Sequence, residues 1–452
     1  MDLNLTACKN EAFADALDFL DHQIRSGVKL GLESTRQLLA RLDNPERRCR
    51  FIHVAGTNGK GSVCCLLASA LAASGYKVGM YTSPHLVNVR ERYRINQRAI
   101  SEWEFARLME EIRRRGATLF GKEGAPSFFE VCTVLAFLYF AREQCDVAIM
   151  EVGMGGRLDA TNVLTPELAV ITRIDLDHTR ALGETRYEIA GEKAGIIKEG
   201  RPVVVGYQED DAMQRLREEV SSRSAPAYWM CEHTKLIETQ LDADRWLQAN
   251  RFLIDDREMV YESGLLGPHQ LENMGLAWSA LHSLQRQGWF LDKTNIAEAW
   301  RRTVWPGRFQ RLRPDFIVDG AHNLSGLEVF YRTIRQLYPP EKKWRVFFGV
   351  LEAKQWQQML DLLATITEEF IFTGIDHPRA ATPQMLEEYC RTYHPRIKVR
   401  TVPRISTVAN ALIKDSIPTL GVGSLYMLGE FFATINGGEP VELWTSDGGS
   451  GQ

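Results

Sequence analysis

The chain has 452 residues, of which 44% are hydrophobic and 25% charged, and its formal net charge at pH 7 is −4. This length predicts two or three domains, and the balance of apolar and charged residues is typical of a soluble globular protein. The mildly acidic charge argues against a general nucleic-acid-binding protein, which would be basic.

Three further features narrow the class of protein. No run of about 18 apolar residues is present, so no transmembrane helix is predicted. The N-terminus, MDLNLTACKNEAFADAL, is acidic and amphipathic and does not resemble a secretory signal. The eight cysteines are scattered without a C-x-x-C pair, which predicts neither a zinc site nor a disulfide framework. We expect a reduced, cytoplasmic protein without a nucleic-acid or membrane partner.

Residues 51–62, FIHVAGTNGKGS, are the first segment that predicts a function. Apolar residues lead into a glycine-rich turn, Gly56 to Ser62, and a helical pattern from Val63 to Ala73 follows. Glycines let the backbone approach a ligand closely, and the freed N–H groups and the helix N-terminus then face an anion. Lys60 can reach a terminal phosphate, and the Ser62 hydroxyl can reach Mg²⁺. The segment therefore favours a nucleoside triphosphate and an enzyme that uses it.

The glycine-rich turn departs from the strict P-loop pattern at two positions. Gly61 stands between Lys60 and Ser62, where the strict pattern has Ser or Thr directly after Lys, and Val54 stands at its first Gly. A glycine-rich turn with an incidental lysine is the alternative interpretation. The strand before the turn and the helix after it favour phosphate binding.

The first 300 or so residues alternate between strand-like and helix-like segments, which is typical of an α/β protein. We expect strands at 76–81, 146–151, 168–174 and 202–206, and helices at 129–140 and 277–287. Residues 226–262 are less regular, with mixed polar and aromatic character. Continuous apolar strands of this kind predict a parallel sheet that is covered on both faces.

Trp305-Pro306-Gly307 interrupts this pattern and is the best candidate for a linker. A second α/β series follows, with strands expected at 316–319, 344–350, 370–374, 397–402 and 424–428. We therefore expect a P-loop ATPase domain with a mainly parallel sheet over residues 1–304 and a smaller, Rossmann-like α/β domain over residues 305–452. The segment 445–452 has the composition of a disordered tail.

Polar side chains follow the predicted strands at their carboxyl ends, where open α/β sheets bind their ligands. Ser83 and His85 follow the second strand, Glu151 ends the third, and residues 175–178 add two acids and a histidine after the fourth. Each residue alone has a structural explanation, such as an N-cap or a local hydrogen bond. Their convergence with a phosphate loop predicts a magnesium–nucleotide site, because Mg²⁺ takes few protein oxygens and keeps waters and phosphates.

Nine motifs along the chain resemble those of one enzyme family. HVAGTNGKGS, TSPHL, SFFE, EVGMGGRLDATN, LDHTRALG, EKAGIIK, PGRFQ, DGAHN and GSLYMLGE occur in this order. Together they resemble the folylpolyglutamate synthases and dihydrofolate synthases of the wider Mur ligase group, over roughly residues 25 to 435. One such motif is a weak signal, whereas nine in order are very specific.

The resemblance implies a role for each matching residue. The nucleotide ligands would be Asn58, Gly59, Lys60, Gly61, Ser62, Asn273, Arg308 and Asp319. Ser83, Glu130 and His178 would surround magnesium. Lys193 would carry a carbamate beside a second magnesium ion, and His322 would face the reacting carboxylate or the incoming glutamate. The pattern alone assigns Glu130 to a helix start and Lys193 to a solvated helix face. The expected catalytic residues are thus Lys60, Lys193 and His322.

The same resemblance implies the substrate ligands. They would be Gly31, Leu32, Glu33, Thr82, Pro84, His85, Gly155, Gly156 and Arg157. GLEST, residues 31–35, resembles the substrate-binding GLER segment of the family, with Ser34 where Arg is usual. The implied substrates are L-glutamate and either dihydropteroate or a reduced folate. The implied cofactors are ATP, two Mg²⁺ ions and K⁺, and the implied state is a monomer.

The implied reaction is an ATP-dependent amide ligation. A pteroate or folate carboxylate would take the γ-phosphoryl group of ATP, and the amine of L-glutamate would attack the acyl phosphate. A cell-wall Mur ligase, a small-molecule kinase and a non-catalytic nucleotide-binding switch are the alternatives. The first carries an extra domain ahead of its phosphate loop, whereas 55 residues precede Gly56 here. Glutamate-dependent ADP release separates a ligase from a kinase.

Overall fold

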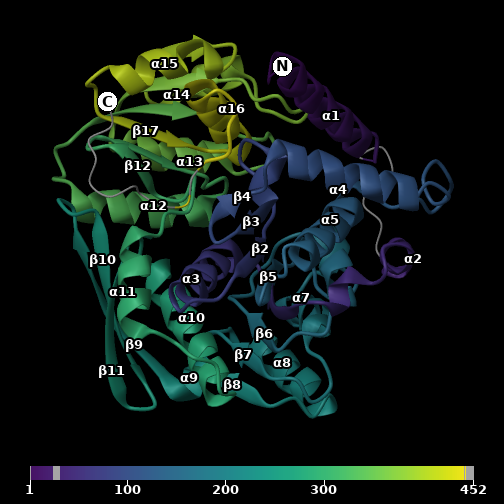
Figure 1. Cartoon of the computed structure of the whole chain (residues 1–452). Coiled ribbons are helices and arrows are strands. Elements are labelled where there is room, and N and C mark those ends of the chain that lie inside the picture. Colours follow the sequence, from purple (N-terminus) through teal and green to yellow (C-terminus); the bar gives the residue numbers. More distant parts are fainter. Residues whose placement is uncertain (1, 24–30, 442, 444–452) are drawn as a thin grey trace.

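The computed structural model describes residues 2–23, 31–441 and 443, with side chains from residue 11 onward within these ranges. Figure 1 shows a larger body and, above it, a smaller α/β body formed by the C-terminal part of the chain. Each contains a mainly parallel sheet with helices on both faces, which confirms the predicted fold class.

The larger body is built on an eight-stranded sheet in the order β4-β3-β2-β5-β1-β6-β7-β8. Five neighbouring pairs are parallel, and the two pairs at the β4 edge are antiparallel. The strands are β1 (Arg50–Ala55), β2 (Val78–Tyr81), β3 (Tyr93–Ile95), β4 (Arg98–Ala99), β5 (Val147–Glu151), β6 (Leu168–Ile171), β7 (Val203–Val205) and β8 (Ala227–Trp229).

Helices cover both faces of this sheet (Figure 1). One face packs on α3 (Lys60–Ala73), α10 (His269–Arg286) and α11 (Lys293–Arg302). The other packs on α1 (Asp2–His22), α2 (Glu33–Arg41), α4 (Glu102–Arg115), α5 (Phe128–Arg142), α7 (Arg186–Lys193) and α8 (Asp210–Ser222). In β1, Ile52 and Val54 face the first core and Phe51 faces the second, so the strand is a continuous apolar run.

A regular antiparallel sheet occupies much of residues 226–262, which the sequence pattern described only as less regular. It comprises β9 (Thr234–Asp242), β10 (Leu247–Ile254) and β11 (Arg257–Ser263), and the short helix α9 (Met230–His233) precedes it. Alternate residues of β10 are buried, but two of them are Gln248 and Asn250, which hide the apolar alternation. The Gln248 amide donates to the Asn250 side-chain oxygen at 2.7 Å and to the Gly267 carbonyl at 3.1 Å, and the Asn250 amide donates to the Gln248 carbonyl at 3.1 Å. These bonds offset the cost of burying both amides.

The smaller body contains a six-stranded sheet in the order β12-β13-β17-β14-β15-β16. Only β12 runs antiparallel to its neighbour. The strands are β12 (Gln310–Arg313), β13 (Phe316–Asp319), β14 (Trp344–Phe348), β15 (Thr367–Thr373), β16 (Lys398–Val402) and β17 (Thr419–Val422). Its helices are α12 (Leu324–Leu337), α13 (Trp356–Ala364) and α14 (Pro383–Tyr393) on one face, and α15 (Ser406–Lys414) and α16 (Leu425–Asn436) on the other.

The last predicted strand, 424–428, is the start of α16, and β17 lies just before it. Ser424 is the N-cap of this helix, because its hydroxyl accepts a hydrogen bond from the Tyr426 N–H at 3.1 Å. A short apolar run does not distinguish one turn of a buried helix from a strand, which explains the error.

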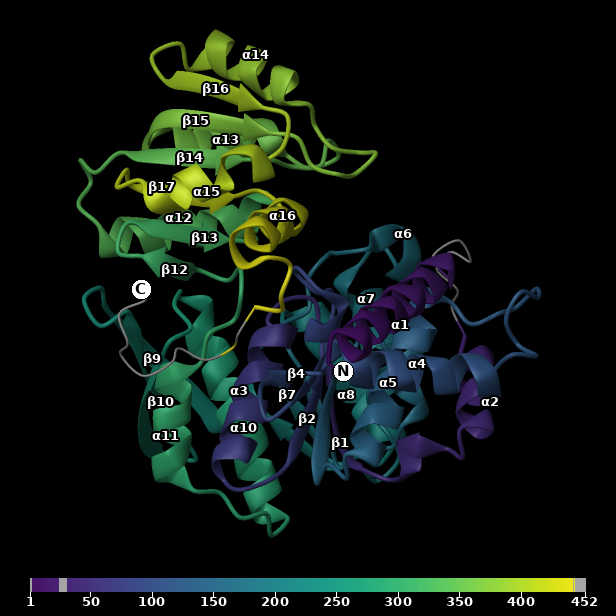
Figure 2. The ribbon, with the colours of Figure 1, turned by 45° about the horizontal axis from the view of Figure 1, so that its top comes forward.

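Two segments connect the bodies. The linker leaves α11 at Thr303, whose hydroxyl donates to the Ser69 hydroxyl of α3 at 3.3 Å. After α16 the chain returns to the larger body, as Figure 2 shows for the yellow segment. Leu443 accepts a hydrogen bond from the Val304 N–H at 2.9 Å, and its side chain, 1% exposed, joins the α3–α10 core. The predicted tail, 445–452, lies outside the described residues.

Candidate active site

The phosphate loop connects β1 to α3, as predicted. The N–H groups of Thr57 and Asn58 donate to the Arg173 carbonyl at 2.9 and 3.2 Å. The Thr172 hydroxyl donates to the Asn58 carbonyl at 2.7 Å. These bonds fix the loop to the segment after β6, so two carboxyl-end loops of the sheet form one surface.

Two loop positions require glycine because other segments approach them closely. Gly59 has a φ of 86°, and a Cβ atom there would lie 2.3 Å from the Asn273 amide oxygen. A Cβ atom at Gly61 would lie 2.8 Å from the Trp305 ring. Helix α10 and the linker therefore lie directly against the loop. The predicted nucleotide residues that this contact brings together are Gly59, Gly61, Ser62 and Asn273, with Gln270 between the last two.

Two lysines meet at the phosphate loop. The Lys60 ammonium donates to the Gly56 and Thr57 carbonyls, both at 3.1 Å. Lys193, the last residue of α7, donates to the same Gly56 carbonyl at 2.8 Å and is 5% exposed. Burial, together with the Lys60 charge, lowers the pKa of Lys193 to about 7. Lys193 is therefore not the solvated helix lysine that its position in the sequence pattern indicates.

Glu151 is the acid that the structure places beside Ser83. It ends β5, is 4% exposed, and accepts a hydrogen bond from the Ser83 N–H at 3.0 Å. Burial raises its pKa, while the nearby charges of Lys60 and Arg308 lower it. An acid at the end of the strand next to a phosphate loop is the usual magnesium-binding carboxylate of P-loop enzymes. Sequence analysis placed Glu151 on the rim of the site but did not assign it to the metal.

Glu130, one of the predicted magnesium ligands, caps a helix in the structure. Its carboxylate accepts from the N–H and hydroxyl of Ser127 at 2.8 and 2.7 Å, forming the capping box of α5. The same carboxylate also accepts from the hydroxyls of Ser34 and Thr35. Four donors therefore occupy it, and they join the N-termini of α2 and α5. Its assignment to the metal with Ser83 and His178 stays a prediction.

His178 lies at a small cleft next to the phosphate loop. Its side chain is 57% exposed and is 3.7 Å from the Asp177 carboxylate. The cleft, about 30 Å³, is lined by Gly56, Thr57, Lys60, Val152, Gly153, Met154, Gly155, Asp177, His178, Leu182 and Lys193. Among the described residues, no three His, Cys, Asp or Glu side chains form a complete metal cage. A few protein ligands are nevertheless enough for Mg²⁺ when phosphates and waters supply the rest.

The smaller body contributes a second set of charged groups. The Arg308 charge lowers the pKa of Glu151 in one body and of Asp319 in the other, although burial raises both values. Asp319 accepts from the N–H groups of Phe309 and Ala321, both at 2.7 Å, so its carboxylate supports the backbone around Arg308. A ribose contact by Asp319 stays a prediction.

His322 is positioned by its own loop. Its Nδ1 lies 2.9 Å from the Gly320 carbonyl, which can only accept, so Nδ1 carries the proton and Nε2 is left as an acceptor. Burial lowers its pKa, and the charges of Lys354 and Arg308 lower it further, whereas Asp177 raises it. Sequence analysis missed Lys354, a half-buried residue that lies in none of the nine motifs and whose only signal is its place after β14.

The predicted substrate residues fall into three groups along the chain. Gly31 and the N-cap Leu32 lead into α2, which begins at Glu33 next to the Ser34–Glu130 contact. Thr82, Pro84 and His85 follow β2, and His85 accepts from the Arg92 guanidinium at 2.9 Å. Burial and the Arg92 charge lower the pKa of His85 to about 3, so its ring stays neutral. Gly155 lines the cleft, and Gly156 packs on the Lys193 backbone.

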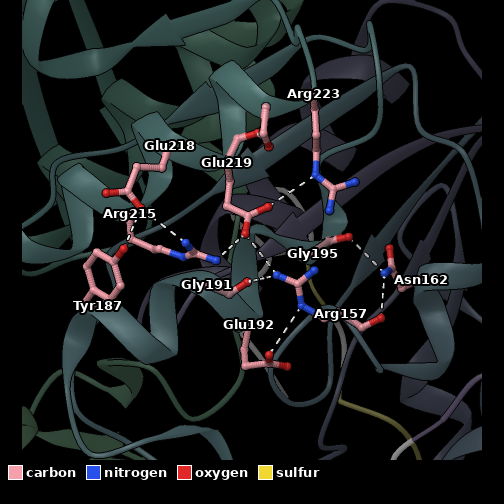
Figure 3. A network of polar contacts seen from close by, with 11 residues as sticks. Arg157, Asn162, Tyr187, Gly191, Glu192, Gly195, Arg215, Glu218, Glu219 and Arg223 are labelled. Atoms are coloured by element: carbon pink, nitrogen blue, oxygen red, sulfur yellow. Dashed lines mark hydrogen bonds and ion pairs between the residues drawn. The ribbon is translucent and has the colours of Figure 1, made fainter.

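Arg157 was predicted to bind substrate, but the structure places its guanidinium in an ion-pair network (Figure 3). It donates to the Gly191 carbonyl at 2.8 Å and to Glu219 at 3.2 Å, and lies 3.4 Å from Glu192. Glu219 also accepts from Arg215 at 2.6 Å. These contacts join α7 to α8, so Arg157 positions the helix that ends in Lys193.

A larger cavity lies elsewhere. It measures about 1040 Å³ and is lined at the amino ends of β1 and β5 by residues such as Arg50 and Asp146. Ligands of open α/β sheets bind at the carboxyl ends. The chemistry therefore belongs to the smaller cleft, where the phosphate loop and the two lysines meet.

A phosphate loop at the carboxyl edge of a parallel sheet, facing charged groups of a second α/β body, defines a two-domain nucleotide-dependent enzyme. Residues 54–281 match the Mur ligase middle domain, and residues 307–418 match the Mur ligase glutamate ligase domain. The chain belongs to the folylpolyglutamate synthase and dihydrofolate synthase family of Mur ligases.

Individual relatives agree with this assignment. The dihydrofolate synthase/folylpolyglutamate synthase of Bacillus subtilis is 39% identical over 386 residues, which cover 82% of this chain and 87% of the relative. The crystal structure of Thermotoga maritima folylpolyglutamate synthase has a TM-score of 0.83 and 32% identity, covering 96% of this chain and 99% of that one. The Mycobacterium tuberculosis folylpolyglutamate synthase complexed with ADP and AMPPCP has a TM-score of 0.81 and 28% identity, covering 96% and 100%.

Proposed function

We propose that the chain is an ADP-forming ligase that joins L-glutamate to the carboxylate of a pteroate or folate. The observation that carries the proposal is the meeting of Lys60, Lys193 and Glu151 at a phosphate loop that faces Arg308. The names of the relatives supply the substrates, and AMPPCP in one of them, an analogue of ATP, supplies the nucleotide.

The arrangement suits the electrostatic problem of this reaction, because an anionic carboxylate must approach an anionic phosphate. Lys60 would bind the terminal phosphates, and Arg308 would offset the charge that spreads over the transferred phosphoryl group. Arg308 lies in the smaller body and Lys60 in the larger one. Full stabilisation of the charge on the transferred phosphoryl group therefore requires both bodies together. Closure of the cleft would also exclude water from the acyl phosphate, which hydrolyses readily.

The described residues fit a magnesium ion, which would supply positive charge to the phosphates. Ser83 and His178 would hold it as expected from the family, with Glu151 in place of Glu130 because Glu151 contacts the Ser83 backbone. A carbamate on Lys193 would add an anionic oxygen for a second ion. Potassium stays a prediction from the resemblance alone, as do the monomeric state and the cytoplasmic location.

His322 would assist the second half of the reaction. Its lowered pKa keeps the ring neutral at pH 7, and Nε2 remains able to accept a proton. Glutamate reacts through its neutral amine, so it must lose a proton before or during attack on the acyl phosphate. The half-buried Lys354 nearby would attract a carboxylate of glutamate.

The assignment is tested by glutamate incorporation with dihydropteroate and with tetrahydrofolate, measured side by side. We expect activity on both, because the two reactions share the ATP and glutamate sites and differ only in how far the reacting carboxylate extends. Ser34 lacks the cation that is usual at this position, which would weaken the longer, more anionic substrate. Activity on one substrate defines a monofunctional enzyme, and activity on neither removes the folate assignment. ADP release without glutamate would instead favour a kinase.

Lys193→Ala is expected to abolish ligation, and short carboxylates such as formate or acetate are expected to restore part of it. Carbamylation needs the neutral amine, and a pKa of about 7 supplies it near neutral pH. Since the amine protonates below this pKa, activity should fall as the pH is lowered through 7 and recover with added bicarbonate.

The matched control for this prediction is Lys198→Ala. Lys198 also has a pKa lowered by burial, to about 8, but it bonds to Asn162 rather than to the phosphate loop. Ligation by Lys198→Ala should therefore not depend on added formate or acetate. A plain lysine at 193 in the intact mass of an active, bicarbonate-equilibrated sample would refute the carbamate.

We also propose that the bodies are domains spanning residues 1–304 and 305–452, and that they move about the linker. Gly307 has a φ of 68°, and Trp305 packs on the phosphate loop, so nucleotide binding and hinge geometry share one contact. Small-angle scattering with and without ATP and substrate should show a more compact particle in the complex. Identical profiles would indicate a rigid two-domain body.

A further inference from the structure

Glu91 is a buried carboxylate that the proposed reaction does not use. It lies in the short helix Val89–Arg92 and is 7% exposed. Its Oε2 accepts from the Leu86 N–H at 2.7 Å, and the N–H of Val87 lies 3.3 Å from both oxygens. These donors directly follow Ser83 and His85. Glu91 therefore holds the end of residues 82–88, which we call the active-site loop.

The same carboxylate binds a segment that is distant in the sequence. The Val441 N–H donates to Glu91 Oε1 at 3.2 Å, and the Arg94 guanidinium donates to the Val441 carbonyl at 2.6 Å. We call Gly438–Val441 the C-terminal strap; in Figure 2 it is the yellow segment that leaves α16 toward the larger body. The strap also contacts the active-site loop directly, because the Asn88 side chain donates to the Gly438 carbonyl at 3.2 Å.

Helix α16, which precedes the strap, touches the other side of this loop. A Cβ atom at Gly429 would lie 2.2 Å from the Leu86 carbonyl, so the helix backbone and the loop are in direct contact. The N–H of Leu86 is bound by Glu91 and its carbonyl faces α16. The position of the active-site loop thus depends on both the C-terminal strap and the smaller body, to which α16 belongs.

A local explanation for Glu91 accounts for only part of these contacts. Glu91 completes a capping box with Asn88, whose N–H lies 3.4 Å from its carboxylate. A capping box requires neither the shorter bond to Leu86 nor the bond to Val441. A carboxylate that accepts from several N–H groups fixes their relative positions, because each bond is charge-assisted.

We propose that Glu91 is a positioning residue that couples the C-terminal strap to the active-site loop, so that docking of the strap fixes Ser83 and His85 for magnesium and substrate. The kinetic consequence of this coupling rests on the proposed function. The coupling itself is a property of the fold and can be measured without turnover.

Val441→Pro removes the strap N–H that donates to Glu91 and leaves the active-site loop unchanged in sequence. Val441→Ala is the matched control, because it trims the same side chain but keeps the N–H. Hydrogen exchange of the full-length protein is followed by mass spectrometry in a peptide that covers 83–90. The exchange rate there should rise about tenfold in Val441→Pro, the factor that loss of a hydrogen bond to a charged group can produce.

In Val441→Pro, the peptide that covers 56–62 should exchange at the wild-type rate. In Val441→Ala, all peptides should exchange at the wild-type rate. Glu91→Gln, which weakens the shared acceptor, should accelerate exchange in the same loop peptide. Wild-type exchange of the loop in Val441→Pro, or acceleration spread evenly over the chain, would overturn the coupling. Hydrogen exchange can be measured even if the chain has no ligase activity. Failure of the coupling can therefore be distinguished from failure of the proposed function.

In an active enzyme, Val441→Pro should raise the KM for the folate substrate and the Mg²⁺ requirement several-fold with little change in kcat at saturation. A merely structural defect would lower the active fraction and hence kcat, with KM unchanged. A drop in kcat alone would therefore contradict the positioning role.

Discussion

Lys60→Ala is expected to lower ATP-dependent glutamate ligation by at least about 100- to 1000-fold, the loss seen when one preorganised charge-stabilising donor is removed. The Lys60 ammonium lies at the phosphate loop, and its only described partners are two carbonyls of that loop. Removal of this charge would leave the transferred phosphoryl group without the lysine of the phosphate loop. Because Lys60 is partly exposed and outside the apolar core, the fold should persist.

ADP release and thermal unfolding measured on the same sample test this prediction. Lys77→Ala is the control, because Lys77 is a 40% exposed lysine that pairs with Glu143 and lies outside the cleft. It should keep wild-type turnover. Wild-type turnover in Lys60→Ala would refute the phosphate role, and a large fall in its unfolding temperature would mean that the lost activity reflects misfolding.

Glu151→Gln and Glu130→Gln form a pair that separates the two candidate magnesium ligands. Glu151→Gln should lower kcat by about 100-fold or more and raise the Mg²⁺ concentration for half-maximal rate, because the anionic oxygen beside Ser83 is lost. Glu130→Gln should keep the Mg²⁺ dependence of the wild type. Its cost should appear in the free energy of unfolding, by about 1–3 kcal/mol, because a buried acceptor of four hydrogen bonds is replaced.

Titration of the initial rate with Mg²⁺ and urea unfolding of both variants distinguish these roles. Normal magnesium dependence in Glu151→Gln together with a shifted dependence in Glu130→Gln would restore the assignment that the sequence motifs imply. Equal shifts in both variants would indicate an indirect effect through the active-site loop.

Local motifs predict the phosphate loop and the carboxyl-end residues because their chemistry depends on neighbours in the chain. Glu130 and Glu151 are harder to assign, since both are acids next to long apolar segments. Only the folded chain shows that Glu130 accepts hydrogen bonds from the hydroxyls of Ser34 and Thr35, about 95 residues upstream. Its role is thus set by tertiary contacts that no single motif contains.

Other features escape sequence analysis for different physical reasons. In β10, the buried amides of Gln248 and Asn250 satisfy each other, so a buried strand contains polar residues at core positions. The start of α16 is too short and apolar to show a period. Arg157 has the residue type of a substrate ligand, and only its partners on α7 and α8 reveal its structural role. On the strap side, the contacts with Glu91, Arg94 and Asn88 use backbone groups of Gly438 and Val441, which leave no mark in the sequence.

The buried position of Leu443 has a consequence for how the protein is made. Its side chain fills part of the core beneath the phosphate loop helix, yet it is synthesised after the whole smaller body. On the ribosome, the nucleotide-binding half must therefore wait with an incomplete core until the last part of the chain emerges, although N-terminal domains generally fold first. A chain truncated before this residue would lack one apolar side chain of the core that packs on α3, together with the carbonyl that accepts from Val304 in the linker.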